Sequence, residues 1–183
     1  MIVETIFSTL DEDGRPNFAP MGLTWEEMKV HPFRNTSTYK NLISLGQGVA
    51  NVTDNVLLFA RSAISHCDFP HFPARKVRGV VLEDVCYWRE LEVSTVEEDE
   101  ERAEMSCRVV AEGRKRDFLG FNRGKNAVIE AAILATRLKL HDWDEVRSAF
   151  RRWDEIVART GEKEEEEAMQ LLRKYVERYY GGD

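Results

Sequence analysis

The sequence has few features of an exported, membrane-bound or nucleic-acid-binding protein. Among 183 residues there are only three cysteines (Cys67, Cys86 and Cys107) and no C-x-x-C pair, so we expect no disulfide framework and a reducing, cytoplasmic location. No apolar run approaches the roughly 20 residues that span a bilayer, and the acidic N-terminal stretch lacks the basic start of a signal peptide. The net charge of -7 argues against general binding to nucleic acid or anionic membranes.

Several common catalytic signatures are also missing. There is no Walker phosphate loop, no G-x-G-x-x-G, and no Ser–His–Asp or Cys–His arrangement that rises above chance. What remains is an ordinary globular composition, with 43% hydrophobic and 32% charged residues. The length allows one domain, or one domain with a helical appendage, and any anion site in so acidic a chain must be local.

The hydrophobic periodicity predicts an α+β protein. Strands are expected over residues 2–10, 18–27, 28–33, 48–53, 79–96 and 102–113. Helices are expected over residues 36–45, 55–64, 122–140, 142–159 and 162–179. A loop is expected over residues 65–77 because they contain two prolines. Pro20 and Gly22 predict a bulge in their strand, and Gly46 with Gly48 predicts the end of the preceding helix. This order favours an antiparallel sheet or small barrel with one inserted helix and C-terminal helices.

The segment RNTSTYKNL, residues 34–42, has more polar groups than a helix start needs. One capping side chain is usual, yet four small polar residues, Asn35 to Thr38, follow Arg34 and precede Lys40. Free N–H groups and the helix dipole attract anions at such an end, and the two cations add charge. The pattern predicts a cradle for a phosphate monoester, with plain capping at a surface turn as the alternative.

A second group of basic residues lies between residues 114 and 125. Arg114, Lys115 and Arg116 are followed by Arg123 and Lys125, which start a predicted helix, where cations oppose the helix dipole. A nearby anion would remove that penalty. The group therefore favours a ligand site, with solvated surface bases as the alternative.

Metal-ligand residue types are dense in one place only. His66, Cys67, Asp68 and His71 lie within six residues, and zinc could bind His66, Cys67 and His71. The spacing matches no standard zinc pattern, so a substrate-facing loop and ordinary loop packing are further alternatives. A metal-dependent hydrolase that uses His66 and His71 is the less favoured function that follows from this cluster.

Four segments in combination resemble an uncharacterised, largely archaeal family of the FMN-binding split-barrel superfamily, which also contains flavin reductases and pyridoxamine-phosphate-oxidase-like proteins. They are ETIFSTLDEDGRPNFAPMG, TSTYKNL, GVANVTDN and GFNRGKNAVIEAAILATRL. The resemblance implies a Greek-key split β-barrel over residues 1–121, a C-terminal helical part over 122–183, and a homodimer with FMN at the subunit interface.

The resemblance also implies which residues bind FMN. The residues implied to bind the phosphate are Arg34, Thr36, Ser37, Thr38 and Lys40. The resemblance places the flavin ring beside the strand residues Ala19, Pro20, Met21 and Gly22. It places the polar edge of the ring near Asn51, Val52, Thr53 and Asp54. Asn122, Arg123 and Lys125 match a motif at the cofactor or the active-site mouth, supplied by either subunit.

The sequence thus predicts an FMN-binding flavoprotein, an oxidoreductase that transfers hydride through flavin N5 to or from a small molecule. The alternative is a non-catalytic protein that binds FMN or another phosphorylated ligand. The catalytic residues, the substrate and the electron donor do not follow from the sequence.

Overall fold

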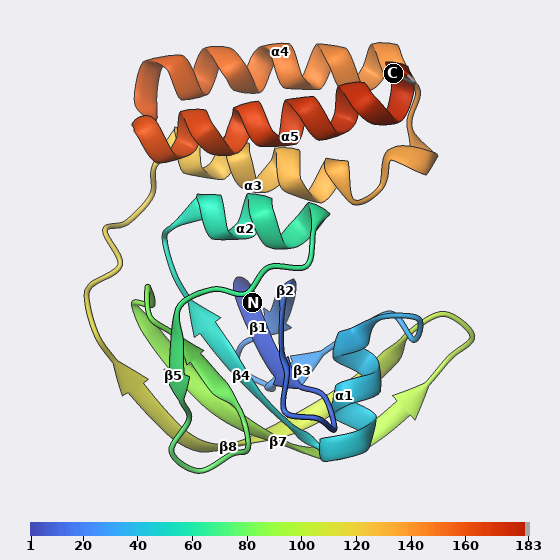
Figure 1. The fold of residues 1–183 in the computed structure, drawn as a ribbon, viewed down its shortest axis with the longest axis vertical. Helices are drawn as coiled ribbons and strands as arrows, with labels where there is room; N and C mark the ends of the chain where they lie inside the picture. The colour runs from blue at the N-terminus through green and yellow to red at the C-terminus, as the bar shows by residue number, and fades with distance from the viewer. Residues whose placement is uncertain (182–183) are drawn as a thin grey trace. The chain divides into compact units, whose positions relative to one another are not determined.

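A computed structural model of the chain describes residues 1–181, which divide into two units (Figure 1). The barrel unit comprises Met1–Thr53 and Cys67–Phe118, and the helical unit joins Asp54–His66 to the chain from Leu119 onward. The helical unit therefore includes a segment, Asp54–His66, that we expected to accompany the barrel. Positions 182 and 183, which the predicted C-terminal part includes, lie outside the described residues.

Six strands of the barrel unit close into an antiparallel barrel in the order β1-β2-β3-β8-β7-β4. They are β1 (Ile2–Leu10), β2 (Pro16–Thr24), β3 (Lys29–Val30), β4 (Gln47–Val52), β7 (Tyr87–Glu98) and β8 (Ala103–Arg114). Alternate residues of each strand point inward. The interior is filled by apolar side chains that include Phe7, Leu23, Val30, Leu91 and Met105. The α+β class and the antiparallel barrel are confirmed.

A short hairpin, β5 (His71–Pro73) and β6 (Val80–Leu82), is paired separately from the barrel. We expected a loop up to residue 77 and one strand over 79–96, and both expectations were wrong here. The hairpin backbone is held by side chains of the barrel strands. Ser8 Oγ donates to the Val80 carbonyl at 2.5 Å, and Asn51 Oδ1 accepts from the Leu82 N–H at 3.0 Å.

Glu90 in β7 makes the third of these attachments. Its side chain has no exposed surface, and its carboxylate accepts backbone N–H groups from Arg75 at 3.0 Å, Lys76 at 2.6 Å and Val77 at 3.3 Å. Burial raises the pKa of this carboxyl, but these N–H donors and Trp88 outweigh burial and hold it below the ordinary glutamate value. The turn between β5 and β6 is therefore organised around a buried anion.

Helix α1 (Ser37–Leu45) packs on β1, β2 and β4. Thr36 caps its start by accepting the Tyr39 N–H, and Gly46 ends it in the left-handed conformation with φ 64°. The expectation that Gly48 also closes the helix was wrong, because Gly48 lies in β4, where a side chain would collide with the ring of Phe7.

Strand β2 runs without the bulge that we expected from its proline and glycine. Its pairing with β1 is continuous from Ile2–Thr24 to Leu10–Pro16. On its other side β2 pairs with β3 only at Leu23 and Thr24, so the missing N–H of Pro20 removes no ladder bond there. The register shifts of this barrel lie in the β7–β8 pair instead.

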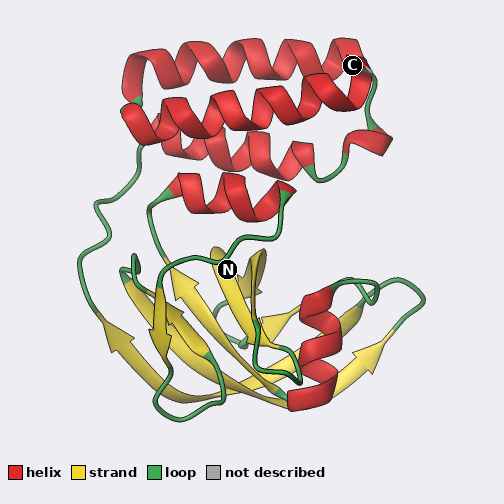
Figure 2. Ribbon diagram, viewed as in Figure 1, coloured by secondary structure: helices red, strands yellow, loops and turns green. Residues whose placement is uncertain are grey.

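Among the described residues of the helical unit, all regular secondary structure is helical (Figure 2). The helices are α2 (Val56–Ile64), α3 (Arg123–Ala135), the 3-10 turn η1 (Leu138–Leu140), α4 (Trp143–Thr160) and α5 (Lys163–Gly181). Helix α2 packs on α3 and α5, and α3 packs on α4. The helix predicted to reach residue 140 ends at Ala135, where the Thr136 N–H is shared among three carbonyls.

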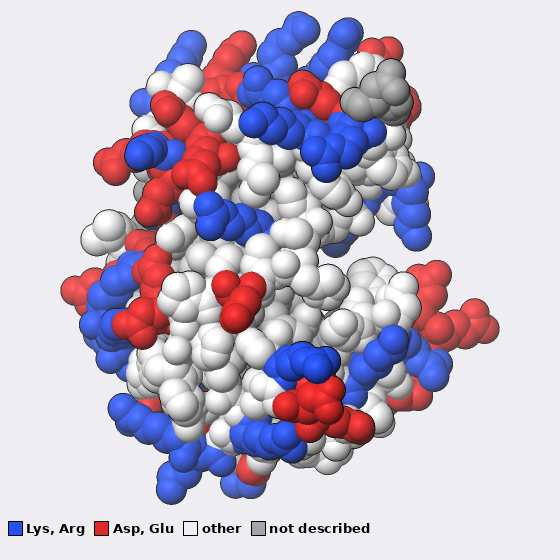
Figure 3. Space-filling model, viewed as in Figure 1, with Lys and Arg blue, Asp and Glu red and all other residues white. Residues whose placement is uncertain are grey.

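Across residues 1–181, none of the helices has both the length and the apolar character needed to cross a membrane. On the face drawn in Figure 3, basic and acidic side chains stand beside one another on both units. On that face neither unit therefore presents charges of one sign alone.

We predict that Glu90→Gln destabilises the folded protein by about 3 kcal/mol, because an amide cannot satisfy N–H donors arranged around a buried carboxylate. The folded pKa is lowered, so the contribution is complete above the ordinary value of 4.5 and is lost as pH falls through the folded pKa. Chemical denaturation at pH 7 and pH 3 measures both effects. An equal difference between wild type and variant at the two pH values would contradict this account.

Candidate functional site

The predicted phosphate cradle is a continuous segment at the start of α1. Thr36 is the cap, and the N–H groups of Ser37 and Thr38 belong to the first helical turn, which has no intrahelical acceptors. Ser37 and Lys40 are exposed, whereas Thr38 is buried and its Oγ1 accepts from Asn17 Nδ2 at 3.0 Å. The structure therefore leaves the N–H and hydroxyl of the exposed Ser37 and the ammonium of Lys40 available at this helix end.

Arg34 precedes this helix start in the sequence, and its side chain is held by the tip of the β7–β8 hairpin. Its Nη1 donates to the Asp99 carbonyl at 3.0 Å, and its Nη2 lies 3.4 Å from Glu98 Oε2. Tyr39 donates its hydroxyl to the same Glu98, which raises the pKa of Tyr39. Two of the five guanidinium donors are thus used, and the side chain remains 43% exposed, so it can also reach an anion.

The strand residues Ala19, Pro20, Met21 and Gly22 are half-buried along β2. Met21 packs against the barrel interior, and its carbonyl accepts the Thr5 hydroxyl at 2.9 Å. This stretch has a neighbouring strand on one side only, since β3 pairs no further than Leu23. Its second backbone edge is therefore without strand partners over these four residues.

The end of β4 differs from what we expected. Asn51 has no exposed surface, and its amide is used inside the barrel unit, with Nδ2 donating to the Ile6 carbonyl at 3.0 Å and Oδ1 accepting from Leu82. Val52 and Thr53 are also buried, and Thr53 Oγ1 lies 3.5 Å from Arg116 Nη2. The side chain of Asn51 thus has a structural task that leaves no surface for a cofactor.

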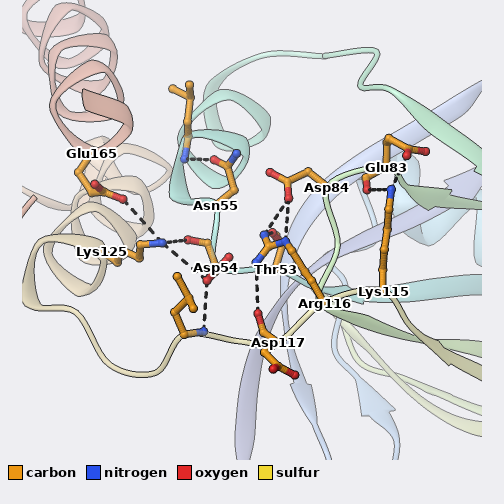
Figure 4. Close-up of polar contacts among 12 residues, drawn as sticks. Thr53, Asp54, Asn55, Glu83, Asp84, Lys115, Arg116, Asp117, Lys125 and Glu165 are labelled. Atoms are coloured by element: carbon orange, nitrogen blue, oxygen red, sulfur yellow. Dashed lines mark hydrogen bonds and ion pairs between the residues drawn. The ribbon is translucent and has the colours of Figure 1, made fainter. Parts of the chain in front are cut away.

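The three bases at residues 114–116 are matched by acids of the barrel unit. Arg114 pairs with Asp117, Lys115 with Glu83, and Arg116 Nη2 with Asp84 Oδ1 at 2.7 Å. The Arg116–Asp84 pair is visible in Figure 4. These contacts account for the three bases without a ligand.

The other members of the predicted site, Asp54, Asn122, Arg123 and Lys125, belong to the helical unit. Asn122 caps α3 by accepting the Lys125 N–H at 3.0 Å, and its Nδ2 donates to the Thr160 carbonyl. Arg123 is exposed, and within residues 1–181 no acidic side chain forms an ion pair with it.

Lys125 is enclosed by acidic groups at the starts of α2 and α5 (Figure 4). Its Nζ donates to the Asp54 carbonyl at 2.8 Å and lies 3.8 Å from Asp54 Oδ2 and 3.9 Å from Glu165 Oε1. The side chains of both acids are 4% exposed. The anion that we inferred near Lys125 is thus supplied by the chain itself.

Residues 66–71 were the candidate metal ligands of the sequence. Within residues 1–181 no group of three or more His, Cys, Asp or Glu side chains is placed to hold a metal ion. His71 Nδ1 lies 2.7 Å from the Phe69 carbonyl and its ring packs against Phe18. A carbonyl only accepts, so Nδ1 carries the proton, and His71 serves the attachment of β5.

Sequence reasoning missed two polar groups of the barrel strand β7, Glu90 and Arg89. Glu90 organises the β5–β6 turn, as described above. Arg89 stacks on Trp25, with its Cζ 4.0 Å from the ring centroid. The run YWRE, residues 87–90, was the available signal, because two charged residues placed between Trp88 and Leu91 need partners when their strand is buried.

Comparison with protein families places almost all of the chain in one family. Residues 3–116 match the family described as protein of unknown function (DUF447) N-terminal domain, and residues 122–174 match protein of unknown function (DUF447). These two stretches leave out only residues 117–121 between them and short ends.

Among solved structures, the chain is similar to an FMN-bound protein from Methanosarcina mazei, of the same DUF447 description, with 26% identity, a TM-score of 0.83 and coverage of 95% of this chain and 94% of that one. An FMN-binding protein from Thermus thermophilus with bound p-hydroxybenzaldehyde matches at 19% identity, TM-score 0.51, over 62% and 71%. Flavoredoxin of Desulfovibrio vulgaris matches at 12% identity, TM-score 0.51, over 62% and 70%. The last two show the fold alone.

We predict that Lys125→Met destabilises the protein by about 2–4 kcal/mol, because it leaves two buried carboxylates without their cation. Arg123→Met is the matched control, and its cost should stay below about 0.5 kcal/mol, as for an exposed side chain without an ion pair. Thermal unfolding of the two variants decides the point, and equal melting temperatures would show that Lys125 is not structural.

Proposed function

Because this chain belongs to the DUF447 family, we propose that it is an FMN-binding flavoprotein. The observation that carries the proposal is the match to an FMN-bound member of the family over 95% of this chain. Both neighbours at lower identity, flavoredoxin and the Thermus FMN-binding protein, share the barrel. The family membership and the fold point to the same cofactor.

The residues at the start of α1 fit the phosphate of FMN. The first-turn N–H groups of Ser37 and Thr38, the Ser37 hydroxyl and the half-exposed Arg34 are donors of the kind that bind phosphate. Lys40, exposed one turn further, adds charge. We propose that these groups, with the cap Thr36, hold the phosphate.

We propose that the flavin ring lies along β2 at Ala19–Gly22. The open backbone edge of this stretch offers polar groups, and Met21 offers an apolar side chain. Val52, Thr53 and Asp54 remain proposed neighbours of the ring's polar edge, while Asn51 is left out because its amide is used within the barrel unit. Asn122 and the exposed Arg123 remain proposed residues of the active-site mouth, supplied by either subunit. Lys125 is left out because its ammonium is matched by Asp54 and Glu165.

Bound FMN would supply hydride or single-electron chemistry, and the protein would hold it and shape a site for a small-molecule substrate. An oxidoreductase is our first proposal, and a non-catalytic FMN-binding protein is the second. The absorption spectrum of the purified protein tests both for bound flavin. Bleaching of the flavin bands by NADH or NADPH without oxygen supports the oxidoreductase, and no bleaching by either donor supports the second proposal. A cytoplasmic location, suggested by the three scattered cysteines, is part of the proposal.

We predict that Arg34→Ala weakens FMN binding by about 1.5–3 kcal/mol, the scale of a hydrogen bond to a charged group. Riboflavin lacks the phosphate, so its weaker binding should hardly change. Arg15→Ala is the matched control, because Arg15 is 78% exposed and forms an ion pair with the similarly exposed Asp13. Titration followed by flavin fluorescence gives the affinities, and an unaltered FMN affinity would place the phosphate elsewhere.

We also propose that the protein is a homodimer with the cofactor at the subunit interface. Leu119 and Phe121, two residues apart in the chain, are 85% and 99% exposed, and large exposed apolar patches mark interaction sites. Light scattering should give twice the monomer mass of 21.2 kDa at micromolar concentration. Changing both residues to serine should weaken the dimer, while Leu140→Ser, 68% exposed in the same unit, should not. A monomer mass with FMN bound would exclude the dimer.

A further inference from the structure

Arg89 of β7 has fewer partners than a half-buried guanidinium needs. Its side chain is 26% exposed, yet its one hydrogen bond within residues 1–181 is from Nη1 to Met28 Sδ at 3.4 Å, and a thioether is a weak acceptor. Its ion-pair partner, Glu112, lies 3.7 Å from Nε and is 72% exposed. At least three of its five N–H donors are left to solvent or a ligand.

The surroundings of Arg89 are aromatic. Its Cζ lies 4.0 Å from the centroid of the Trp25 ring, and the Trp25 ring meets that of Tyr87 edge to face, with centroids 5.8 Å apart. Burial raises the pKa of the Tyr87 hydroxyl, in agreement with a site partly shielded from water. Flat apolar surfaces therefore stand beside the guanidinium.

The location is one end of the barrel. Tyr87 begins β7 opposite Val52 at the end of β4, and Arg89 pairs across the sheet with Ala50 on one side and Glu112 on the other. The neighbouring cation Arg114 is paired with Asp117. Arg89 is thus a cation at this barrel end whose donors the described residues leave largely unfilled.

An arginine kept only for structure would have its donors filled by carbonyls or buried carboxylates, as the Glu90 site fills its own groups. A guanidinium stacked on an indole instead presents its remaining edge to a planar anion, which can accept two parallel N–H bonds and pack against the rings. We propose that Arg89, Trp25 and Tyr87 form a binding site for a planar aromatic or conjugated carboxylate. This goes beyond the proposed FMN site and does not require it.

The first test compares two probes of equal shape on the wild-type protein, with and without FMN. Benzoate should bind saturably by titration calorimetry, and benzamide, which lacks the charge, should bind at least tenfold more weakly. No saturable binding of benzoate, or equal binding of both probes, would overturn the proposal. Because the titration is also done without FMN, its outcome is separate from that of the flavin assay.

The second test locates the site. Arg89→Met should weaken benzoate binding at least fivefold, and Arg89→Lys, which keeps the charge but loses the fork, should weaken it less. Arg108→Met is the control, because Arg108 is 70% exposed on β8 and pairs with Glu92. If Arg89→Met lowers the melting temperature, two other measurements show whether benzoate binds at this site. They are the benzoate affinity of the lysine variant and the change in the indole N–H chemical shift of Trp25 when benzoate is added. Unaltered affinity in both Arg89 variants would place benzoate elsewhere.

Discussion

The buried carboxylate of Glu90 is the constraint on which the β5–β6 hairpin, the outer layer of the barrel unit, depends. A strand points alternate side chains inward and outward, so β1, β4 and β7 carry Ser8, Asn51 and Glu90 on the face opposite the apolar interior. All three are buried, and buried polar groups must find partners. The β5–β6 hairpin supplies them from its backbone, and in return its short strands, which could not be stable alone, gain a fixed place.

How far the sequence predicts this structure can be seen from particular residues. The barrel follows from alternating strands, and the capping residues Thr36 and Asn122 mark helix starts correctly because capping is a local interaction. The hairpin was missed because Pro70 and Pro73 favour a loop, whereas the contacts that order it come from other strands, and Ser8 lies more than sixty residues before the hairpin strand that it binds. Tertiary contacts of this kind leave no local signal.

The basic residues show the same limit for the candidate site. A sequence shows that a cation is present but not whether an acid faces it. The basic residues at 34–40 and those at 114–125 looked alike in the sequence, but their partners in the structure differ. Arg114, Lys115, Arg116 and Lys125 are neutralised within the chain. Arg34 and Arg89 keep donors available, although one is held by a carboxylate and the other stacks on an indole. Only the distribution of partners separates structural cations from candidate ligand residues.

Helix α2 has a consequence for how the chain is made. It lies between β4 and β5 in sequence, yet it packs with α3 and α5, so the chain leaves the barrel strands at residue 54, returns at 67 and leaves again at 119. During synthesis α2 emerges well before its partners, with Val56 and Ala60 lacking the neighbours that finally bury them. A fragment truncated at residue 121 would keep this helix without its partners. Expressing the barrel unit by itself would therefore require that α2 be replaced by a polar connection.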